Sequence, residues 1–221
     1  MEETKNLIYK KVSNLKATTT QKELAEVYAE WGPTYDKLID DLSYTGPAIG
    51  AAKLNEKLKE LGHDNNVSIV DLGCGTGLVG EQLYNLGYKN IDGMDLSEHM
   101  LKVAEEKGVY RSLHKGIMGS DGSVDLGVEP KQYDAVICVG VFASGHVKGE
   151  GMNDFLFVVK AGGLIVFNIN ESVIEDSDYK YHEKMEELSN QGKWKLLLKT
   201  YERKYNAHRG AYFYVYQKIR D

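Results

Sequence analysis

A glycine-rich loop between an expected strand and an expected helix constrains the fold of this chain more than any other feature. The loop, Gly73-Cys74-Gly75-Thr76-Gly77, follows the apolar run 67–72 and precedes helical spacing over 77–86. Glycines there allow a tight turn and a close approach of a ligand to the backbone, and the helix N-terminus adds N–H donors. Strand, loop and helix in this order favour a ligand-binding α/β domain over a simple turn.

Strands and helices alternate through the rest of the chain. Alternation of this kind indicates a parallel sheet that right-handed crossovers cover on both faces. No helix separates the last two strands, so they are expected to pair as an antiparallel hairpin. We therefore predict a Rossmann-like, doubly wound, mostly parallel seven-stranded sheet with an antiparallel C-terminal hairpin and an N-terminal helical lid. The predicted strands are 67–72, 91–96, 110–115, 133–139, 164–169, 194–205 and 211–219, and the helices are 20–31, 46–62, 77–86, 98–107, 152–159 and 179–190.

The composition narrows the classes of partner. With 27 basic and 33 acidic residues the formal net charge is −6, which disfavours nucleic acid and anionic membrane surfaces. The sequence shows no apolar run of membrane-spanning length and no signal-peptide pattern, so we expect a cytoplasmic protein. Cys74 and Cys138 fall in segments expected to be buried, which disfavours a disulfide, and the histidines and cysteines show no metal-ligand spacing.

Two carboxylates near the loop indicate the ligand. The spacing is G-x-G-x-G, whereas dinucleotide sites have G-x-G-x-x-G. Asp71 disfavours a pyrophosphate by like-charge repulsion and suits a ligand that carries an ammonium group, such as S-adenosylmethionine. Asp95, at the end of the second predicted strand, can accept hydrogen bonds from ribose hydroxyls.

These residues resemble a known family. The segment 71–77 together with 93–97 resembles class I S-adenosylmethionine-dependent methyltransferases, and the resemblance runs from about Tyr28 to the end of the sequence. The segment 28–36, with Gly145-His146-Val147, is similar to the methyltransferase-like proteins of the Williams–Beuren syndrome chromosome region. The resemblance implies S-adenosyl-L-methionine as cofactor and S-adenosyl-L-homocysteine as product. We expect one structural domain with a flexible polar arm (1–19), an N-terminal helical lid (20–62) and a methyltransferase domain (63–221).

The resemblance also implies contacts to the cofactor. The glycine loop and Asp71 would meet its methionine part, Asp95 its ribose, and Val139 its sulfonium. The family often carries an acidic residue after the third strand, which this sequence lacks, so backbone groups of Ile117 or Met118 are expected to meet the adenine. With the aromatic residues of the lid, the expected cofactor-binding residues are Tyr28, Trp31, Asp71, Gly73, Cys74, Gly75, Asp95, Leu96, Met100, Ile117, Met118 and Val139.

Catalysis is expected to rest on alignment, with a base required only where the acceptor arrives protonated. His146, shortly after the fourth strand, is the candidate base, although a histidine in a surface loop is an equally simple interpretation. Tyr35 is a candidate for orienting the acceptor. We predict methylation of a small molecule at an N, O or S atom. A protein or peptide methyltransferase and a cofactor-binding module without turnover stay open as alternatives, and a nicotinamide-dependent oxidoreductase is a weaker one.

Overall fold

Parallel strands form the centre of a seven-stranded sheet whose order is β3-β2-β1-β4-β5-β7-β6. The computed structural model describes residues 15–31, 43–207 and 209–220. Pairing is parallel from β3 through β5, and β7 pairs antiparallel with both β5 and β6. The strands are β1 (Ile69–Leu72), β2 (Ile91–Asp95), β3 (Ser112–Lys115), β4 (Tyr133–Phe142), β5 (Val159–Asn170), β6 (Trp194–Glu202) and β7 (Ala211–Lys218). The predicted Rossmann-like, mostly parallel seven-stranded sheet with antiparallel C-terminal strands is confirmed.

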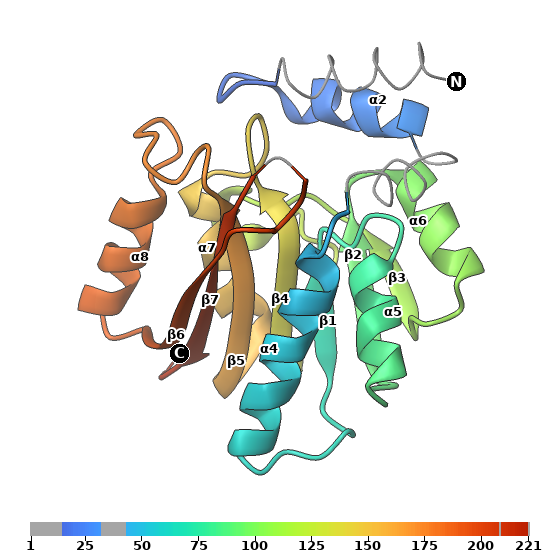
Figure 1. Ribbon diagram of the computed structural model, residues 1–221, viewed down its shortest axis with the longest axis vertical. Coiled ribbons are helices and arrows are strands. Elements are labelled where there is room, and N and C mark those ends of the chain that lie inside the picture. Colours follow the sequence, from blue (N-terminus) through green and yellow to red (C-terminus); the bar gives the residue numbers. More distant parts are fainter. Residues whose placement is uncertain (1–14, 32–42, 208, 221) are drawn as a thin grey trace.

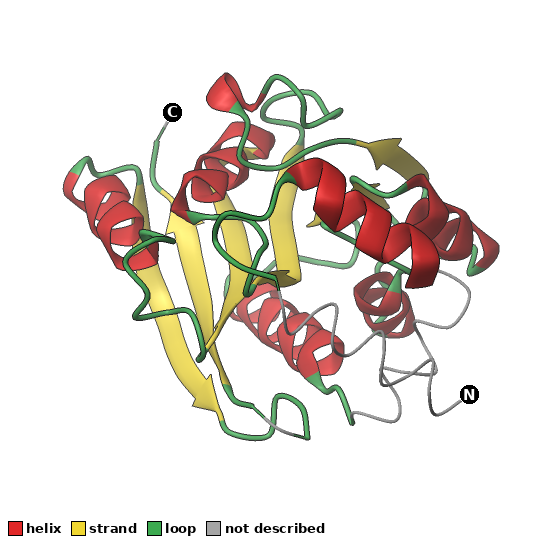
Figure 2. Cartoon of the chain, turned by 90° about the horizontal axis from the view of Figure 1, so that it is seen from above, coloured by secondary structure: helices red, strands yellow, loops and turns green. Residues whose placement is uncertain are grey.

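Helices cover both faces of the sheet, as Figure 1 shows. Two hydrophobic clusters form the core, one beneath α4 and α5 and the other beneath α7 and α8. Across the carboxyl ends of the central strands lies α2, which is seen from above in Figure 2. The helices are α2 (Gln21–Trp31), α4 (Gly46–Glu60), α5 (Leu78–Asn85), α6 (Glu98–Glu106), α7 (Met152–Val158) and α8 (Tyr181–Asn190), with short 3-10 turns η2 (Asp121–Ser123) and η3 (Gly149–Gly151).

Local signals set where these helices begin and end. Pro47 occupies the first turn of α4, where its missing N–H costs nothing, and Gly62 lies just past the end with φ +78°. The Ser97 hydroxyl accepts a hydrogen bond from the Met100 amide and so caps α6. These features are the ones from which the helix boundaries were predicted.

The start of β5 differs from the prediction. Sequence reasoning places a turn at Gly162-Gly163 and begins the strand at Leu164, whereas β5 begins at Val159, directly after α7. Tyr133 pairs with Val159, and the next registered pair is Ala135 with Leu164, so the extra residues of β5 form a bulge. Gly162, at φ +83°, supplies the left-handed conformation that the bulge requires.

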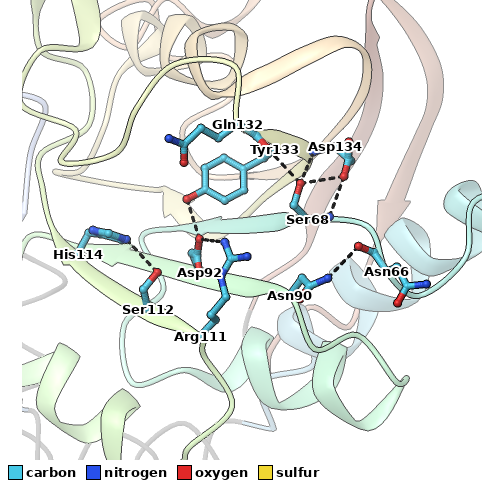
Figure 3. A network of polar contacts seen from close by, with 10 residues as sticks. All are labelled: Asn66, Ser68, Asn90, Asp92, Arg111, Ser112, His114, Gln132, Tyr133 and Asp134. Carbon is cyan, nitrogen blue, oxygen red and sulfur yellow. Dashed lines mark hydrogen bonds and ion pairs between the residues drawn. The ribbon is translucent and has the colours of Figure 1, made fainter.

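A network of polar side chains joins β2 to its neighbours around Asp92, whose side chain is nearly buried (Figure 3). Arg111 donates from Nε and Nη2 to the two carboxylate oxygens, and the Tyr133 hydroxyl donates to Oδ2 at 3.0 Å. Burial alone would raise the pKa of Asp92, but hydrogen bonds from Arg111, Ser112 and Tyr133 hold this pKa below its ordinary value. The network therefore links neighbouring strands of the sheet, and the Arg111 guanidinium balances the charge of Asp92.

Three further expectations concern the chain as a whole. Across the described ranges, no helix combines the length and apolarity that a membrane span requires. Cys74 and Cys138 are buried free thiols. The predicted arm is described only from residue 15 onward, and Tyr35 lies outside the described residues.

Candidate active site

A cleft opens at the carboxyl edge of the sheet, where doubly wound folds bind ligands. Together with its open mouth, the cleft holds about 660 Å³ of empty space. The glycine loop and the end of β2 form one side, the segment after β3 forms the floor, and the end of β4 forms the other side. The helix α2 closes the cleft through Gln21, Leu24 and Tyr28.

The glycine loop forms a cradle in the cleft wall. Gly73 and Gly75 both have positive φ, at +75° and +55°. A Cβ at Gly73 would lie 2.3 Å from a methyl carbon of Val141, so no larger residue fits there. Around a Cβ at Gly75 no described atom lies within 4 Å, so this glycine faces open space into which a ligand can come close to the backbone.

Asp95 ends β2 in the cleft wall. Its Oδ2 accepts from the Gly75 amide at 2.9 Å and its Oδ1 from the Ser97 amide at 2.8 Å. Burial raises the pKa of Asp95, and the hydrogen bonds from Ser97, Gly75 and Leu96 oppose the rise. Each carboxylate oxygen can accept a second hydrogen bond, so Asp95 is oriented by the backbone and still able to bind hydroxyl groups.

Asp71 lies beneath the loop, away from the cleft wall where it was expected. Its side chain is completely buried, and Tyr110 donates a hydrogen bond to Oδ2 at 2.7 Å. Oδ1 has no hydrogen-bond partner among the described residues. Burial raises the pKa of Asp71 to about 7, against the lowering by Tyr110 and with a small rise from Asp95. The structure therefore shows a buried carboxyl with one unmatched oxygen behind the cradle.

The apolar residues predicted for the cofactor divide into two groups. Leu96, Met100, Met118 and Val139 all line the cleft, as expected. Cys74 and Ile117 do not. The Cys74 side chain is buried behind the loop, and the Ile117 amide donates to the Asp125 carbonyl at 2.8 Å, which removes it as an adenine donor.

Tyr28 and His146 meet across the mouth of the cleft. The Tyr28 hydroxyl lies 2.6 Å from Nε2 of His146, and Nδ1 of His146 lies 2.7 Å from the Ser144 carbonyl oxygen. Burial lowers the pKa of His146, while the hydrogen bond to Ser144 acts in the opposite direction. Sequence reasoning selected both residues but not their contact, because they are distant in the chain. Trp31 ends α2, and its side chain lies outside the described residues.

Two further observations complete the site. Seven residues line the cleft that were not predicted as site residues, namely Gln21, Leu24, Met94, Gly116, Gly140, Val141 and Val147. Within the part of the chain that the structure describes, no group of three or more His, Cys, Asp or Glu residues is arranged to hold a metal ion.

Comparison with known proteins decides the family. A family model described as a methyltransferase domain matches residues 69–163. Methyltransferase-like protein 27 of Homo sapiens is 30% identical over 175 residues, which cover 77% of this chain and 68% of that protein. The chain belongs to the class I S-adenosylmethionine-dependent methyltransferases. Its cofactor is therefore S-adenosylmethionine.

Further relatives agree with this assignment. The methyltransferase is 26% identical over 152 residues to the ubiquinone/menaquinone biosynthesis C-methyltransferase UbiE of Campylobacter jejuni, covering 66% of this chain and 63% of that protein. Magnesium protoporphyrin IX methyltransferase of Synechocystis PCC 6803, solved with bound S-adenosylhomocysteine, shares the fold at TM-score 0.56 and 12% identity, covering 77% of this chain and 83% of its own. A chain from the complex of Haloferax volcanii Trm112 with a methyltransferase shares the fold at TM-score 0.65 and 13% identity. The match covers 89% of this chain and 98% of that chain.

The cleft of the methyltransferase fits this cofactor. The open side of Gly75 leaves room against the backbone, and Asp95 keeps acceptor capacity for ribose hydroxyls. Leu96, Met100 and Met118 offer apolar surface for a base ring. The side chain of Asp71 is placed too deep to line the cleft itself.

Proposed function

We propose that this methyltransferase acts on a small, uncharged and largely apolar acceptor. The observation that supports the proposal is the chemistry of the cleft wall. Among the described lining residues none is Lys or Arg, and Asp95 is the one carboxylate. A site built for an anionic acceptor needs a cation, and one for a cationic acceptor needs further carboxylates, because a buried charge without a partner is costly.

The acceptor side of the cleft supports the same proposal. Leu24, Val141 and Val147 supply apolar contact, and Gln21 supplies an amide. Small-molecule sites typically combine a predominantly apolar wall with a few placed polar groups. The Campylobacter relative, whose name is that of a methyltransferase of ubiquinone and menaquinone biosynthesis, agrees with an acceptor of this kind.

The residues of the chain have separate parts in the proposed reaction. Bound S-adenosylmethionine supplies a methyl group on a positively charged sulfur, which is a good leaving group. The glycine loop and Asp95 hold the cofactor in one orientation, and Val139 and Gly140 form the wall beside the acceptor. The helix α2 excludes water through Leu24 and Tyr28. Alignment and exclusion of water supply most of the rate in such a transfer.

A screen for methyl acceptance tests the proposal. The protein is incubated with S-adenosylmethionine carrying a labelled methyl group and with separate small-molecule, protein and RNA fractions. We expect label in an apolar, uncharged small molecule, and about tenfold less label with Asp95→Ala when S-adenosylmethionine is kept below its dissociation constant. Label confined to the protein or RNA fraction would contradict the proposal. S-adenosylhomocysteine binding without label in any fraction would indicate a binding module instead.

A further inference from the structure

We propose that Tyr28 and His146 form a proton relay, in which the acceptor proton passes to the Tyr28 oxygen while the Tyr28 proton passes to Nε2 of His146. The inference deepens the proposed function and rests on it. It makes Tyr28 a catalytic residue and the acceptor a molecule that is methylated on a hydroxyl group.

The hydrogen bonds of His146 fix its tautomer. The Ser144 carbonyl oxygen, 2.7 Å from Nδ1, can only accept, so Nδ1 carries the proton. In a neutral imidazole Nε2 then holds the lone pair. The Tyr28 hydroxyl, 2.6 Å away, is therefore the donor in its bond to Nε2. The direction of proton travel from phenol to imidazole follows from these two contacts.

This arrangement prevents His146 from acting directly. Its single lone pair already receives the Tyr28 proton, and the two rings meet edge to face with centroids 5.7 Å apart. An acceptor proton can reach Nε2 only through the phenol oxygen or after Tyr28 has been displaced. A phenol both donates and accepts hydrogen bonds, so it can pass on one proton while it takes up another.

The surroundings keep the imidazole in the form that a relay requires. Burial lowers the pKa of His146 from 6.5, so the ring is neutral and able to accept a proton at pH 7. The other polar side chains in the described lining are the neutral Gln21 and Tyr28, with Asp95 at the end of β2. No cation among them competes for the lone pair.

The relay identifies the class of acceptor. A hydroxyl of phenol type has a pKa near 10, so it arrives protonated at pH 7 and gains most from a base, whereas a neutral amine already carries its lone pair. In the step, the acceptor oxygen forms a bond to the methyl carbon and the carbon–sulfur bond breaks with its electron pair going to sulfur. The hydroxyl proton moves to Tyr28 and the phenol proton to His146, which ends as imidazolium and returns its proton to water.

A first experiment tests the pair without any acceptor. Protein with ¹⁵N-labelled histidine is studied by NMR in the presence of S-adenosylhomocysteine. We expect a neutral His146 protonated at Nδ1, and a changed Nε2 shift in Tyr28→Phe but not in the matched control Tyr84→Phe, which changes a tyrosine on α5 outside the cleft. A proton on Nε2, or an Nε2 shift indifferent to Tyr28→Phe, would overturn the relay.

A second experiment measures turnover with the acceptor recovered from the screen. Tyr28→Phe and His146→Ala should each lower turnover by about two to four powers of ten. The double variant should be no slower than the slower single one, because the two residues act as one unit. S-adenosylhomocysteine affinity should stay within about threefold of wild type, and Tyr84→Phe should be unchanged.

The outcomes that would contradict the relay can be told apart from the outcome that would contradict the proposed function. If Tyr28→Phe keeps turnover within about threefold while His146→Ala loses it, His146 acts alone. If cofactor affinity falls in parallel with turnover in Tyr28→Phe, Tyr28 holds the cofactor in place and relays nothing. Either result overturns the relay and leaves the proposed function intact, whereas a screen that labels no small molecule removes the proposed function whatever the NMR result.

Discussion

Asp92 and Asp95 lie on the same strand, β2, but in opposite electrostatic settings. Asp92 takes two donors from Arg111 and one from Tyr133, and its pKa is lowered. Among the described residues, Asp95 is held by backbone amides with no cation beside it, and its pKa is raised. The fold thus satisfies the charge of one carboxylate internally and orients the other without neutralising it. The difference distinguishes a structural acid from one that is positioned for a ligand.

Asp71, on the neighbouring strand β1, extends the comparison. Like Asp95, it has no cation partner in the described part of the chain, and like Asp92 it is buried away from solvent. Ionisation of Asp71 therefore destabilises the folded state, because the native protein binds the carboxyl proton more tightly than the unfolded chain does.

The largest effect expected from this comparison is on the pH dependence of folding. The pKa of Asp71 rises from 3.8 unfolded to about 7 folded, so the free energy of unfolding should fall as pH rises through this window. The fall is on the order of 4 kcal/mol by the equivalence of pKa and free energy. Urea denaturation at several pH values should show this slope in the wild type and a flatter profile in Asp71→Asn.

Asp92 changes the free energy of unfolding with pH in the opposite direction from Asp71. Its folded pKa is lowered, so its stabilisation is fully present above about pH 4, its unfolded value, and is lost as pH falls toward the folded pKa. Asp92→Asn should therefore lower the free energy of unfolding above about pH 4 and flatten the slope of the profile on the acid side alone. Identical profiles for wild type and Asp71→Asn would show that Asp71 is not protonated in the native state.

The second effect is on cofactor affinity. Asp95→Ala removes an acceptor of charge-assisted hydrogen bonds and should weaken S-adenosylhomocysteine binding by about 1.5–3 kcal/mol, which is tenfold or more. Isothermal titration calorimetry measures it. An unchanged dissociation constant would show that Asp95 does not hold the cofactor.

Asp92→Ala is the matched control on the same strand. It leaves the buried Tyr133 hydroxyl without its acceptor and should lower the free energy of unfolding by about 1–3 kcal/mol. The half-exposed Arg111 can turn to water, which limits the loss. Affinity for S-adenosylhomocysteine should stay as in the wild type. Loss of affinity in both variants would erase the distinction between the two aspartates.

The smallest effect concerns α2, which we predict to be a lid that orders over the cofactor. A ligand that contacts only the closed state stabilises it by mass action. With S-adenosylhomocysteine at ten times its dissociation constant, hydrogen exchange in residues 21–31 should slow by about tenfold. Exchange in α8, which contributes no residue to the cleft, serves as the control. Equal protection of α2 with and without ligand would indicate a fixed wall.

Sequence reasoning was strongest where one local rule determined the outcome. The glycine loop and the capping of α6 by Ser97 each follow from a few neighbouring residues, and the mostly parallel sheet follows from the alternation of strands and helices. The start of β5 was predicted incorrectly, because a glycine such as Gly162 suits a turn as well as a bulge. In the structure Gly162 lies in a bulge within the strand.

Contacts between distant segments were beyond prediction. The meeting of Tyr28 with His146 depends on where α2 crosses the sheet, which neither local sequence encodes. The depth of Asp71 likewise depends on Tyr110, which follows α6 and reaches under the loop from another segment. Tyr28, His146 and Asp71 were candidates because of their residue types, but only the packing of the folded chain shows which residues they contact.

The position of β7 has a consequence for synthesis on the ribosome. The strand follows β6 in the chain but lies between β5 and β6 in the sheet. As the polypeptide emerges, β6 therefore has no edge to join, and the strand edge of β5 stays open until residues 211–218 have left the exit tunnel. An open strand edge is a template for association with other chains. The longer residues 211–218 remain unpaired, the longer the edge of β5 is available for association with other chains.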